Sequence, residues 1–469
     1  MSTPNIPSSP RHLNLSLIAL VILFISSAAA EPAKPNIVFI LADDLGYGDL
    51  PLYGQEKVDT PHIDTLAAEG MRFTDFYAGA TICSPSRSVL MTGLHTGHTR
   101  IRGNMAPQGG IVGYKGEREV RRANLLESDT TIGHVLGDAG YRTAVIGKWH
   151  LDGFNPEAGP LDRGFHEFYG WMVSEPGTYA STYFPPKRFS NRKLLSIPAN
   201  QDGAEGYYHP DMCLDEAKAF IEKKRTQPFY LHIGLNLPHS PYRTNDFGPY
   251  AEKDWPEAFK HYAAMIHWTD QFVGALLQHL KQTGLDDNTI VFFTSDNGPR
   301  SEPRELQTAI VDFFDSNGPL RGYKRDLSEG GIRVPLIVRW PGKIEAGSAS
   351  QVPGYFADVM PTLAELAGTS PSANTDGLSL VPTFLGEETQ AHDRFLYWED
   401  FEGPFEQAVR WKNWKAIIPE NRPFELYDLS KDIHEDHNLA GSRPEIVAAI
   451  RAYLKTARTE SENWPLSPK

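Results

Sequence analysis

Residues 36–44 read Asn-Ile-Val-Phe-Ile-Leu-Ala-Asp-Asp. An uninterrupted apolar run of this length is typical of a strand buried on both faces, as in parallel sheets covered by helices on two sides. In open α/β sheets, ligands bind at the carboxyl ends of the strands. The stretch therefore predicts an α/β domain in which Asp43 and Asp44 lie at the functional edge of the sheet.

The same alternation of strand-like and helical patterns continues along the chain. Further buried strands are predicted at residues 143–147, 229–235, 289–294 and 335–338. Helices are predicted at residues 63–69, 132–139, 214–224, 259–282 and 356–367. Glycines in C-cap position follow four of these helices, at residues 70, 140, 284 and 368. We therefore expect a mostly parallel central sheet with helices on both faces.

The N-terminal 30 residues have the pattern of a secretory signal peptide. Arg11 and His12 precede an apolar run at residues 13–25, and small residues at 26–30 offer a cleavage site after Ala30. The apolar run is too short to span a membrane comfortably, and a retained anchor is the alternative. We expect export, cleavage and no stable membrane association afterwards.

A change of pattern near residue 388 predicts a second part of the chain. Short strand-like pieces follow at residues 395–398, 408–410, 415–418 and 425–428, and a helical stretch runs from 444 to about 458. We therefore expect a catalytic domain at residues 34–388. A small C-terminal α+β subdomain with a short antiparallel sheet is expected at residues 389–469.

Composition limits the class of protein. The formal net charge of −14 argues against a nucleic-acid partner, which would require a basic surface. An anionic substrate would need a local cluster of cations. Two cysteines exclude a disulfide-rich scaffold, and beyond the signal there is no Asn-x-Ser/Thr site. These features fit a bacterial periplasmic or secreted enzyme.

Chemically capable side chains stand where four predicted strands end. They are Asp43 and Asp44, Lys148 and His150, His239, and Asp296 and Asn297. The carboxylates and the amide offer oxygen ligands, which suit Ca²⁺ or Mg²⁺ better than zinc. Taken singly, each has a simpler interpretation as a turn residue, a surface charge or a structural histidine. Their joint placement at one sheet edge is what indicates a site.

One of the two cysteines lies in a distinctive turn, Cys83-Ser84-Pro85-Ser86-Arg87. A helix is predicted from Pro85 to Thr92, and Arg87, four residues after Cys83, would share its face. A buried structural cysteine is the alternative. The pentapeptide resembles the maturation signature of the type I sulfatases, in which the cysteine is oxidised to Cα-formylglycine.

The resemblance extends over nearly the whole chain beyond the signal. Segments similar to this family, arylsulfatase A-like members of the alkaline phosphatase-like superfamily, lie at residues 36–46, 83–93, 147–151, 160–165, 324–335 and 358–362. These segments occur along the chain in the same order as in the family. One departure is Asp152, which stands where many relatives have glycine.

The resemblance implies one Ca²⁺ ion and a modified cysteine. The implied ligands are Asp43, Asp44, Asp296, Asn297 and an oxygen of the modified Cys83. The ion would polarise the sulfate, and Asp296 would take a proton from the formylglycine hydrate. A maturation enzyme that generates formylglycine is therefore an implied partner.

The cationic side chains receive roles from the same resemblance. Arg87 and Lys148 would steady the hydrate, and His239 and Lys324 would protonate the leaving alcohol. His150 would remove a proton from the second hydroxyl, so that sulfate is eliminated and the aldehyde restored. Together the lysines and histidines would form a cationic cradle for the sulfate.

We expect the substrate to be a sulfated carbohydrate. Trp149, Trp171 and Tyr179 are candidates for stacking on a sugar, although aromatic residues are more often core. Residues 173–208 are the expected specificity loop. Phosphonate monoester or phosphodiester hydrolysis within the same superfamily remains an alternative, and so does non-catalytic binding of sulfated glycans.

Overall fold

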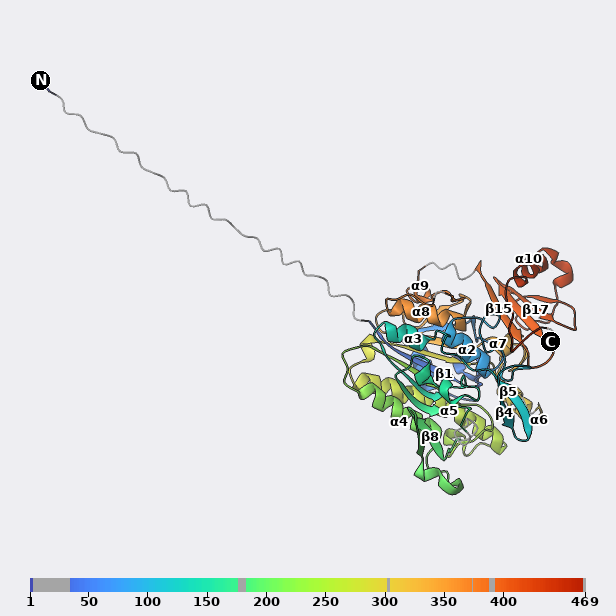
Figure 1. The fold of residues 1–469 in the computed structure, drawn as a ribbon, viewed down its shortest axis with the longest axis horizontal. Helices are drawn as coiled ribbons and strands as arrows, with labels where there is room; N and C mark the ends of the chain where they lie inside the picture. The colour runs from blue at the N-terminus through green and yellow to red at the C-terminus, as the bar shows by residue number, and fades with distance from the viewer. Residues whose placement is uncertain (3–33, 176–182, 302–303, 373, 388–392, 467–469) are drawn as a thin grey trace. The chain divides into compact units, whose positions relative to one another are not determined.

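The computed structural model describes residues 1–2, 34–175, 183–301, 304–372, 374–387 and 393–466 (Figure 1). The predicted signal peptide lies outside the described residues, except for its first two. Residues 34–469 form one compact unit. Among the described residues, we find no helix with the length and apolar character needed to cross a membrane.

A ten-stranded mixed sheet lies at the centre of this unit. In spatial order its strands are β13 (Ser348–Ser350), β2 (Met71–Phe73), β12 (Leu336–Arg339), β11 (Thr289–Ser295), β1 (Asn36–Ala42), β10 (Phe229–Gly234), β6 (Arg142–Lys148), β7 (Glu167–Trp171), β8 (Lys187–Ser190) and β9 (Lys193–Ser196). The five strands from β11 to β7 are parallel, whereas β12 runs antiparallel to β11. The predicted α/β class is confirmed.

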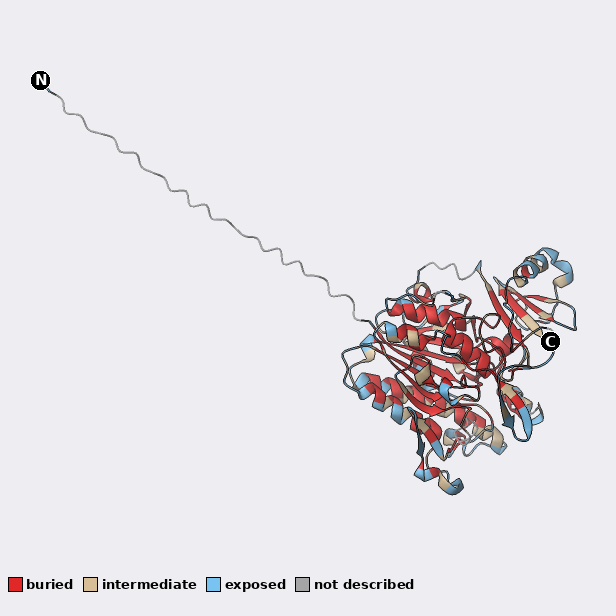
Figure 2. Ribbon diagram, in the orientation of Figure 1, coloured by how far each residue is buried: buried red, intermediate tan, exposed pale blue. Residues whose placement is uncertain are grey.

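The central strand β1 explains why helices cover both faces. Its seven residues are all buried, and the alternate side chains enter two different hydrophobic clusters. Ile37, Phe39 and Leu41 join the cluster under α2, α3 and α8, whereas Val38, Ile40 and Ala42 join the one under α1, α4 and α5. In Figure 2 the sheet and the inner sides of these helices are buried.

The predicted helices are present with shifts at their ends, whereas α6, α7 and α9 were not anticipated. They are α1 (Pro61–Ala68), α2 (Cys83–Thr92), α3 (Ile132–Asp138), α4 (His209–Glu222), α5 (Glu257–Gln282), α6 (Arg304–Phe314), α7 (Glu329–Ile332), α8 (Val359–Leu366), α9 (Val381–Phe384) and α10 (Pro444–Leu454). The helix predicted at 214–224 begins five residues earlier, because Pro210 is accepted in its first turn. The one predicted from Pro85 begins at Cys83, for the same reason.

The C-terminal part forms the expected antiparallel sheet. Its strands are β15 (Phe395–Asp400), β16 (Glu406–Trp411), β17 (Trp414–Pro419) and β18 (Glu425–Asp428). Trp398 on one face enters the main core, while Tyr397 on the other packs in a small cluster with α10. Two short ribbons complete the described fold, β3 (Phe76–Tyr77) with β14 (Gly354–Tyr355) and β4 (Ile111–Lys115) with β5 (Arg118–Arg122).

Candidate active site

Four parallel strands and one helix bring the predicted site residues together. Asp43 and Asp44 follow β1, Asp296 and Asn297 follow β11, His239 comes after β10, and Lys148 and His150 lie at the end of β6. Helix α2 presents Cys83 and Arg87, and a loop before α7 presents Lys324. Asp44 and His150 both have positive φ, 67° and 62°. For residues other than glycine, such strained backbones are common at functional sites.

Helix α2 places its first residue at the centre of the cluster. All ten of its residues are buried. The Cys83 thiol lies 3.5 Å from Oδ1 of Asp43, and Arg87, one turn further on, is 4.0 Å from the same oxygen. The predicted common face of Cys83 and Arg87 is therefore directed at the end of β1. The first-turn amide of Ser84 donates to Asn104 at 3.1 Å.

A row of three glycines allows close approach of neighbouring strands, and one of them, Gly234, lies against Arg87. Gly234, Gly147 and Gly170 are register partners across β10, β6 and β7. A Cβ on Gly147 would lie 2.1 Å from the carbonyl oxygen of Gly234, and a Cβ on Gly234 would lie 3.0 Å from Nη1 of Arg87. Larger residues would therefore displace either the strands or the guanidinium group.

The acidic residues form a group suited to a metal ion. Potential ligand atoms of Asp43, Asp44, Cys83 and His239 lie within 4.8 Å of one another. Oδ2 of Asp44 and Oδ1 of Asn297 are buried without a hydrogen-bond partner among the described residues. Unpartnered buried oxygens are unfavourable unless an ion or a water molecule binds them. The donor set thus fits a hard cation such as Ca²⁺.

Asp296 is oriented differently from the other carboxylates. Its Oδ2 accepts from Nε of Arg87 at 2.9 Å and forms an ion pair with Nη2 at 2.7 Å. Its Oδ1 accepts from the Asp44 amide at 3.3 Å. Burial, followed by the charge of Asp43, raises the pKa of Asp296 to about 6 despite Arg87. Asp296 thus joins the base of the site to helix α2.

Two lysines add positive charge to the group of side chains around Cys83. Nζ of Lys148 is 2.6 Å from Oδ2 of Asp43, and Nζ of Lys324 contacts Asp44 and lies 3.2 Å from the Cys83 sulfur. Burial raises the pKa of Asp43, but Lys148 and the other cations outweigh it and hold that pKa well below its usual range. The site therefore holds ionised carboxylates facing charged ammonium groups.

The Nε2 atom of His239 lies near both Asp44 and Arg300, and Nη1 of Arg300 is 3.5 Å away. Nδ1 of His239 is hydrogen bonded to the carbonyl oxygen of Ser240, which requires a proton on Nδ1, and its Nε2 lies 3.6 Å from Oδ2 of Asp44. Burial lowers the pKa of His239 to about 4, although Asp44 opposes the shift. A neutral His239 can receive a proton at Nε2, and must do so before it can protonate a leaving group there.

His150 has a neighbour that the sequence did not indicate. Nη1 of Arg122, at the end of the β4–β5 ribbon, lies 3.0 Å from Nε2 of His150, and Arg122 is only 7% exposed. Burial, Lys148 and Arg122 lower the pKa of His150 well below its usual range. The run Arg118-Glu-Val-Arg-Arg122 looks like a solvated charged strand, so the sequence carries no signal for this contact.

The expected aromatic and polar pocket residues have different environments. Trp149 is buried in the core and donates to Ala158, so it does not offer a stacking face. The ring centre of Trp171 lies 5.8 Å from Nζ of Lys148. Tyr179 lies outside the described residues. Asp152 accepts from the Ser174 amide at 2.7 Å, so it anchors the beginning of the expected specificity segment.

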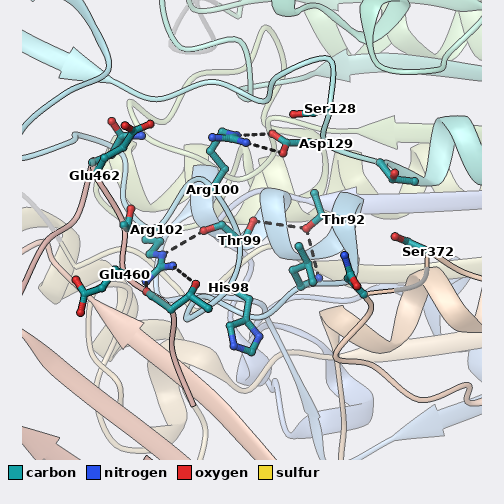
Figure 3. Close-up of a pocket in the computed structure, with 16 residues that line it drawn as sticks. Thr92, His98, Thr99, Arg100, Arg102, Ser128, Asp129, Ser372, Glu460 and Glu462 are labelled. Carbon is teal, nitrogen blue, oxygen red and sulfur yellow. Dashed lines mark hydrogen bonds and ion pairs between the residues drawn. The ribbon is translucent and has the colours of Figure 1, made fainter. Parts of the chain in front are cut away.

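A cavity of about 520 Å³ lies at the opposite end of α2, beside Thr92 (Figure 3). Its arginines already bind carboxylates: Arg100 pairs with Asp129 at 2.6 and 3.0 Å, and Arg102 with Glu399 at 2.9 Å. Thr92 is nine residues from Cys83, which is roughly 14 Å along a helix. The cavity is therefore separate from the cluster around Cys83.

Comparison with known families gives matches over almost the whole described chain. The sulfatase family model matches residues 35–369, and the model of the N-sulphoglucosamine sulphohydrolase C-terminal region matches residues 322–461. Mouse N-acetylgalactosamine-6-sulfatase is 34% identical, covering 98% of this chain and 86% of its own. Human arylsulfatase A is 32% identical, covering 94% and 90%.

Comparison with solved structures also gives matches over most of this chain. Ps i-CgsB in complex with k-i-k-neocarrahexaose has a TM-score of 0.77 and 28% identity, covering 90% of this chain and 93% of its own. A structure from work on glycosaminoglycan metabolism by Bacteroides thetaiotaomicron has a TM-score of 0.74 and 26% identity, covering 91% and 99%. The similarity therefore includes the C-terminal sheet as well as the central one.

Proposed function

Because this chain belongs to the sulfatase family and is a sulfuric ester hydrolase, we propose that it removes sulfate from sulfated carbohydrates, with a formylglycine made from Cys83 and one bound Ca²⁺. The observation that carries the proposal is the position of Cys83. It is the first residue of a buried helix, between the carboxylates that follow β1 and the ammonium group of Lys324. A nucleophile at this position meets both the metal ligands and the cations that an anionic ester requires.

The implied groups fit the residues that are present. Asp43, Asp44, Asp296 and Asn297 would hold the ion, and the unpartnered oxygens of Asp44 and Asn297 support this assignment. Formylglycine would supply a hydrated aldehyde as nucleophile, and Ca²⁺ would withdraw electron density from the sulfate. A formylglycine-generating enzyme in the same host would be required as a partner.

The side chains of this protein divide the remaining work. Arg87 orients Asp296 by a hydrogen bond, and Asp296 would take a proton from the hydrated formylglycine at residue 83. Lys148 and Lys324 balance the negative charge of the sulfate and of the developing alkoxide. Lys324 and His239 lie on the leaving-group side in this proposal and protonate the departing alcohol. His150 would remove a proton from the second hydroxyl of the modified residue 83, so that sulfate is eliminated.

Sugar substrates are favoured by the names of similar proteins. N-acetylgalactosamine-6-sulfatase is named for a sulfated sugar, and Ps i-CgsB was solved in complex with k-i-k-neocarrahexaose. The segment anchored by Asp152 would select among such sugars, because loops on a rigid scaffold usually carry selectivity. We further propose removal of residues 1–30 during export to the periplasm or medium, which N-terminal sequencing of the secreted protein tests.

The test is release of inorganic sulfate by the matured enzyme from a panel of sulfated mono- and oligosaccharides, an aryl sulfate and a lipid sulfate. We expect turnover of at least one sugar sulfate well above that of the lipid sulfate. Rapid turnover of aryl or lipid sulfates without any sugar turnover would refute the substrate proposal. A phosphodiester of the same phenol, assayed in parallel, tests the alternative chemistry, which faster phosphodiester turnover would establish.

A further inference from the structure

The turn that follows β15 contacts two segments that carry groups at the centre of the site. Oε2 of Glu402 accepts from Nη1 of Arg325, which follows Lys324 in the sequence. Oε1 of the same carboxylate accepts from the main-chain amide of Asn104 at 3.1 Å. One side chain from the C-terminal part therefore binds both the segment of Lys324 and the loop that contains Asn104.

The contact with Asn104 leads to the first turn of helix α2. Oδ1 of Asn104 accepts from the amide of Ser84 at 3.1 Å. This amide is one of the first four N–H groups of the helix, which have no acceptor within the helix itself. Asn104 thus caps the end of α2 at which Cys83 lies, and Glu402 holds the main chain of Asn104 in place.

The contact with Arg325 leads to Lys324. Arg325 has a positive φ of 82°, and its amide donates to the carbonyl oxygen of Thr81 at 3.0 Å. Such a backbone conformation persists only where surrounding contacts enforce it. The side chains of Arg325 and Glu402 are 34% and 12% exposed, so salt screens this pair less than an open surface pair. The pair therefore helps to keep Nζ of Lys324 at 3.2 Å from the Cys83 sulfur.

A second acid of the same turn supports Glu402. Oδ2 of Asp400 accepts from the Glu402 amide at 2.9 Å, and its Oδ1 accepts from the hydroxyl of Thr81, two residues before Cys83. Asp400 is the last residue of β15, and Trp398 of the same strand is fully buried in the main core. Glu402 is therefore held at the end of a well-packed strand.

We propose that Glu402 is a positioning residue that fixes the distance between Lys324 and residue 83. It holds Arg325 with one carboxylate oxygen and Asn104 with the other. The coupling of the two segments follows from these contacts, whereas its effect on turnover rests on the proposed sulfatase function, in which Lys324 protonates the departing alcohol. A sugar alcohol needs this proton more than nitrophenol, which leaves as a stable anion. Sugar sulfates should therefore depend on Glu402 more than nitrophenyl sulfate does.

The first measurement is amide hydrogen exchange, read by mass spectrometry in the full chain with unmodified Cys83. Glu402→Leu removes both contacts of the carboxylate. We expect it to speed exchange by about tenfold or more in the peptides that contain the amides of Ser84 and Arg325, because both amides lose their support against local opening. Exchange at wild-type rates in both peptides would overturn the proposal.

Two further variants make this measurement specific. Glu402→Gln keeps an oxygen for the Asn104 amide but has no charge for Arg325, so it should speed exchange in the Arg325 peptide alone. This variant decides the matter if Glu402→Leu does not fold, and wild-type exchange at Arg325 would then contradict the proposal. Glu406→Leu is the matched control, because Glu406 begins the next strand and pairs with exposed Arg422 at 2.6 Å. It should leave both peptides unchanged.

The second measurement is kinetic and uses matured enzyme. Glu402→Leu should lower kcat for a sugar sulfate by about 100-fold and for nitrophenyl sulfate by less than about tenfold, with KM little changed, since a misplaced proton donor affects the chemical step. Glu406→Leu should stay within about twofold of wild type on both esters. Equal losses on the two esters, or a raised KM at unchanged kcat, would refute positioning of Lys324 by Glu402. The expected exchange pattern in a matured protein that hydrolyses no sulfate ester would refute the proposed function and leave the coupling of the two segments standing.

Discussion

Cys83 as a thiol is poorly suited to attack a sulfate ester. Burial raises the pKa of its thiol to about 11, although Lys148 and Lys324 act in the opposite direction. A thiolate, the reactive form, is therefore scarce at neutral pH. This chemistry agrees with our proposal that the active form of residue 83 is not cysteine.

Cys83→Ala tests the nucleophile directly. We expect turnover of any sulfate ester to fall by about 1,000-fold or more, since loss of a catalytic nucleophile has effects of this size. The unfolding free energy should change by only about 1 kcal/mol, because one sulfur atom is removed. Circular dichroism and urea unfolding check the fold, and sulfate release checks activity. Substantial turnover by the variant would contradict the assignment of Cys83.

Asp49 gives a prediction about pH and stability. It is fully buried, and its Oδ2 accepts from the Gly46 amide and the Tyr262 hydroxyl, each at 2.7 Å. Burial raises the pKa of Asp49 to about 7, whereas an unfolded aspartate titrates near 4. The folded state therefore holds the extra proton between these values. The contribution of this proton to the free energy of unfolding is full below about pH 4 and is lost as the pH rises through about 7.

Asp49→Asn should remove this dependence, because the amide oxygen keeps both acceptor contacts and carries no charge. At pH 8 we expect the variant to be more stable relative to wild type than at pH 4, by about 2 kcal/mol or more. Urea unfolding at several pH values measures the difference. A difference between the two proteins that is constant from pH 4 to pH 8 would show that Asp49 does not titrate in this range.

At the scale of elements, the ends of two parallel strands bring the proposed calcium ligands together. Strand β1 contributes Asp43 and Asp44, and its neighbour β11 contributes Asp296 and Asn297. The register pairs Ala42 with Ser295, so the two pairs of oxygen-bearing residues begin side by side. Neither strand alone offers enough oxygen ligands for Ca²⁺.

Calcium should therefore stabilise the folded protein. After treatment with a chelator, we expect Ca²⁺ to raise Tm, because a ligand that binds only the folded state adds about 2.7 kcal/mol at 100 times its Kd. Asp44→Asn should lose most of this shift. Thermal unfolding with Ca²⁺, Mg²⁺ and Zn²⁺ measures the shift, and Glu365→Gln, which changes a remote exposed carboxylate, serves as the control. No calcium-dependent change in wild type would contradict the site.

At the scale of the whole molecule, buried charges join the C-terminal sheet to the core. Nζ of Lys415 on β17 lies 2.9 Å from Oε1 of Glu329 on α7, and both side chains are fully buried. Glu329 also accepts from Tyr77 at 2.7 Å and pairs with Arg333 at 3.1 Å. The C-terminal sheet is thus tied to the segment that follows active-site Lys324.

Removing Lys415 should be strongly destabilising. Lys415→Met leaves the carboxylate of Glu329 with fewer cations in a buried environment, which typically costs about 3 kcal/mol or more. Lys431→Met is the matched control, since Lys431 has a side chain that is 79% exposed and should change stability by no more than about 0.5 kcal/mol. Equal unfolding midpoints in urea for the two variants would argue against this role of Lys415.

Sequence patterns were most successful where burial imposed a regular period. Strand β1 matches its prediction residue for residue, and β18 does the same in the C-terminal sheet. Strand β7 of the parallel part was not anticipated, although four of its five residues are buried. The outer strands β2, β8, β9 and β13 were also not anticipated, because three or four residues carry little period of their own. The direction of β12 was also not readable, since an apolar run looks alike in either orientation.

The sequence by itself determined the α/β class, the family and the residue types at the strand ends, because apolar runs and local motifs are properties of consecutive residues. Only the tertiary structure decided which side chains meet. Arg122 reaches His150 across 28 residues and Lys324 reaches Asp44 across 280, and no local pattern encodes such contacts. It also placed Trp149 in the core, where packing density left no face for a sugar.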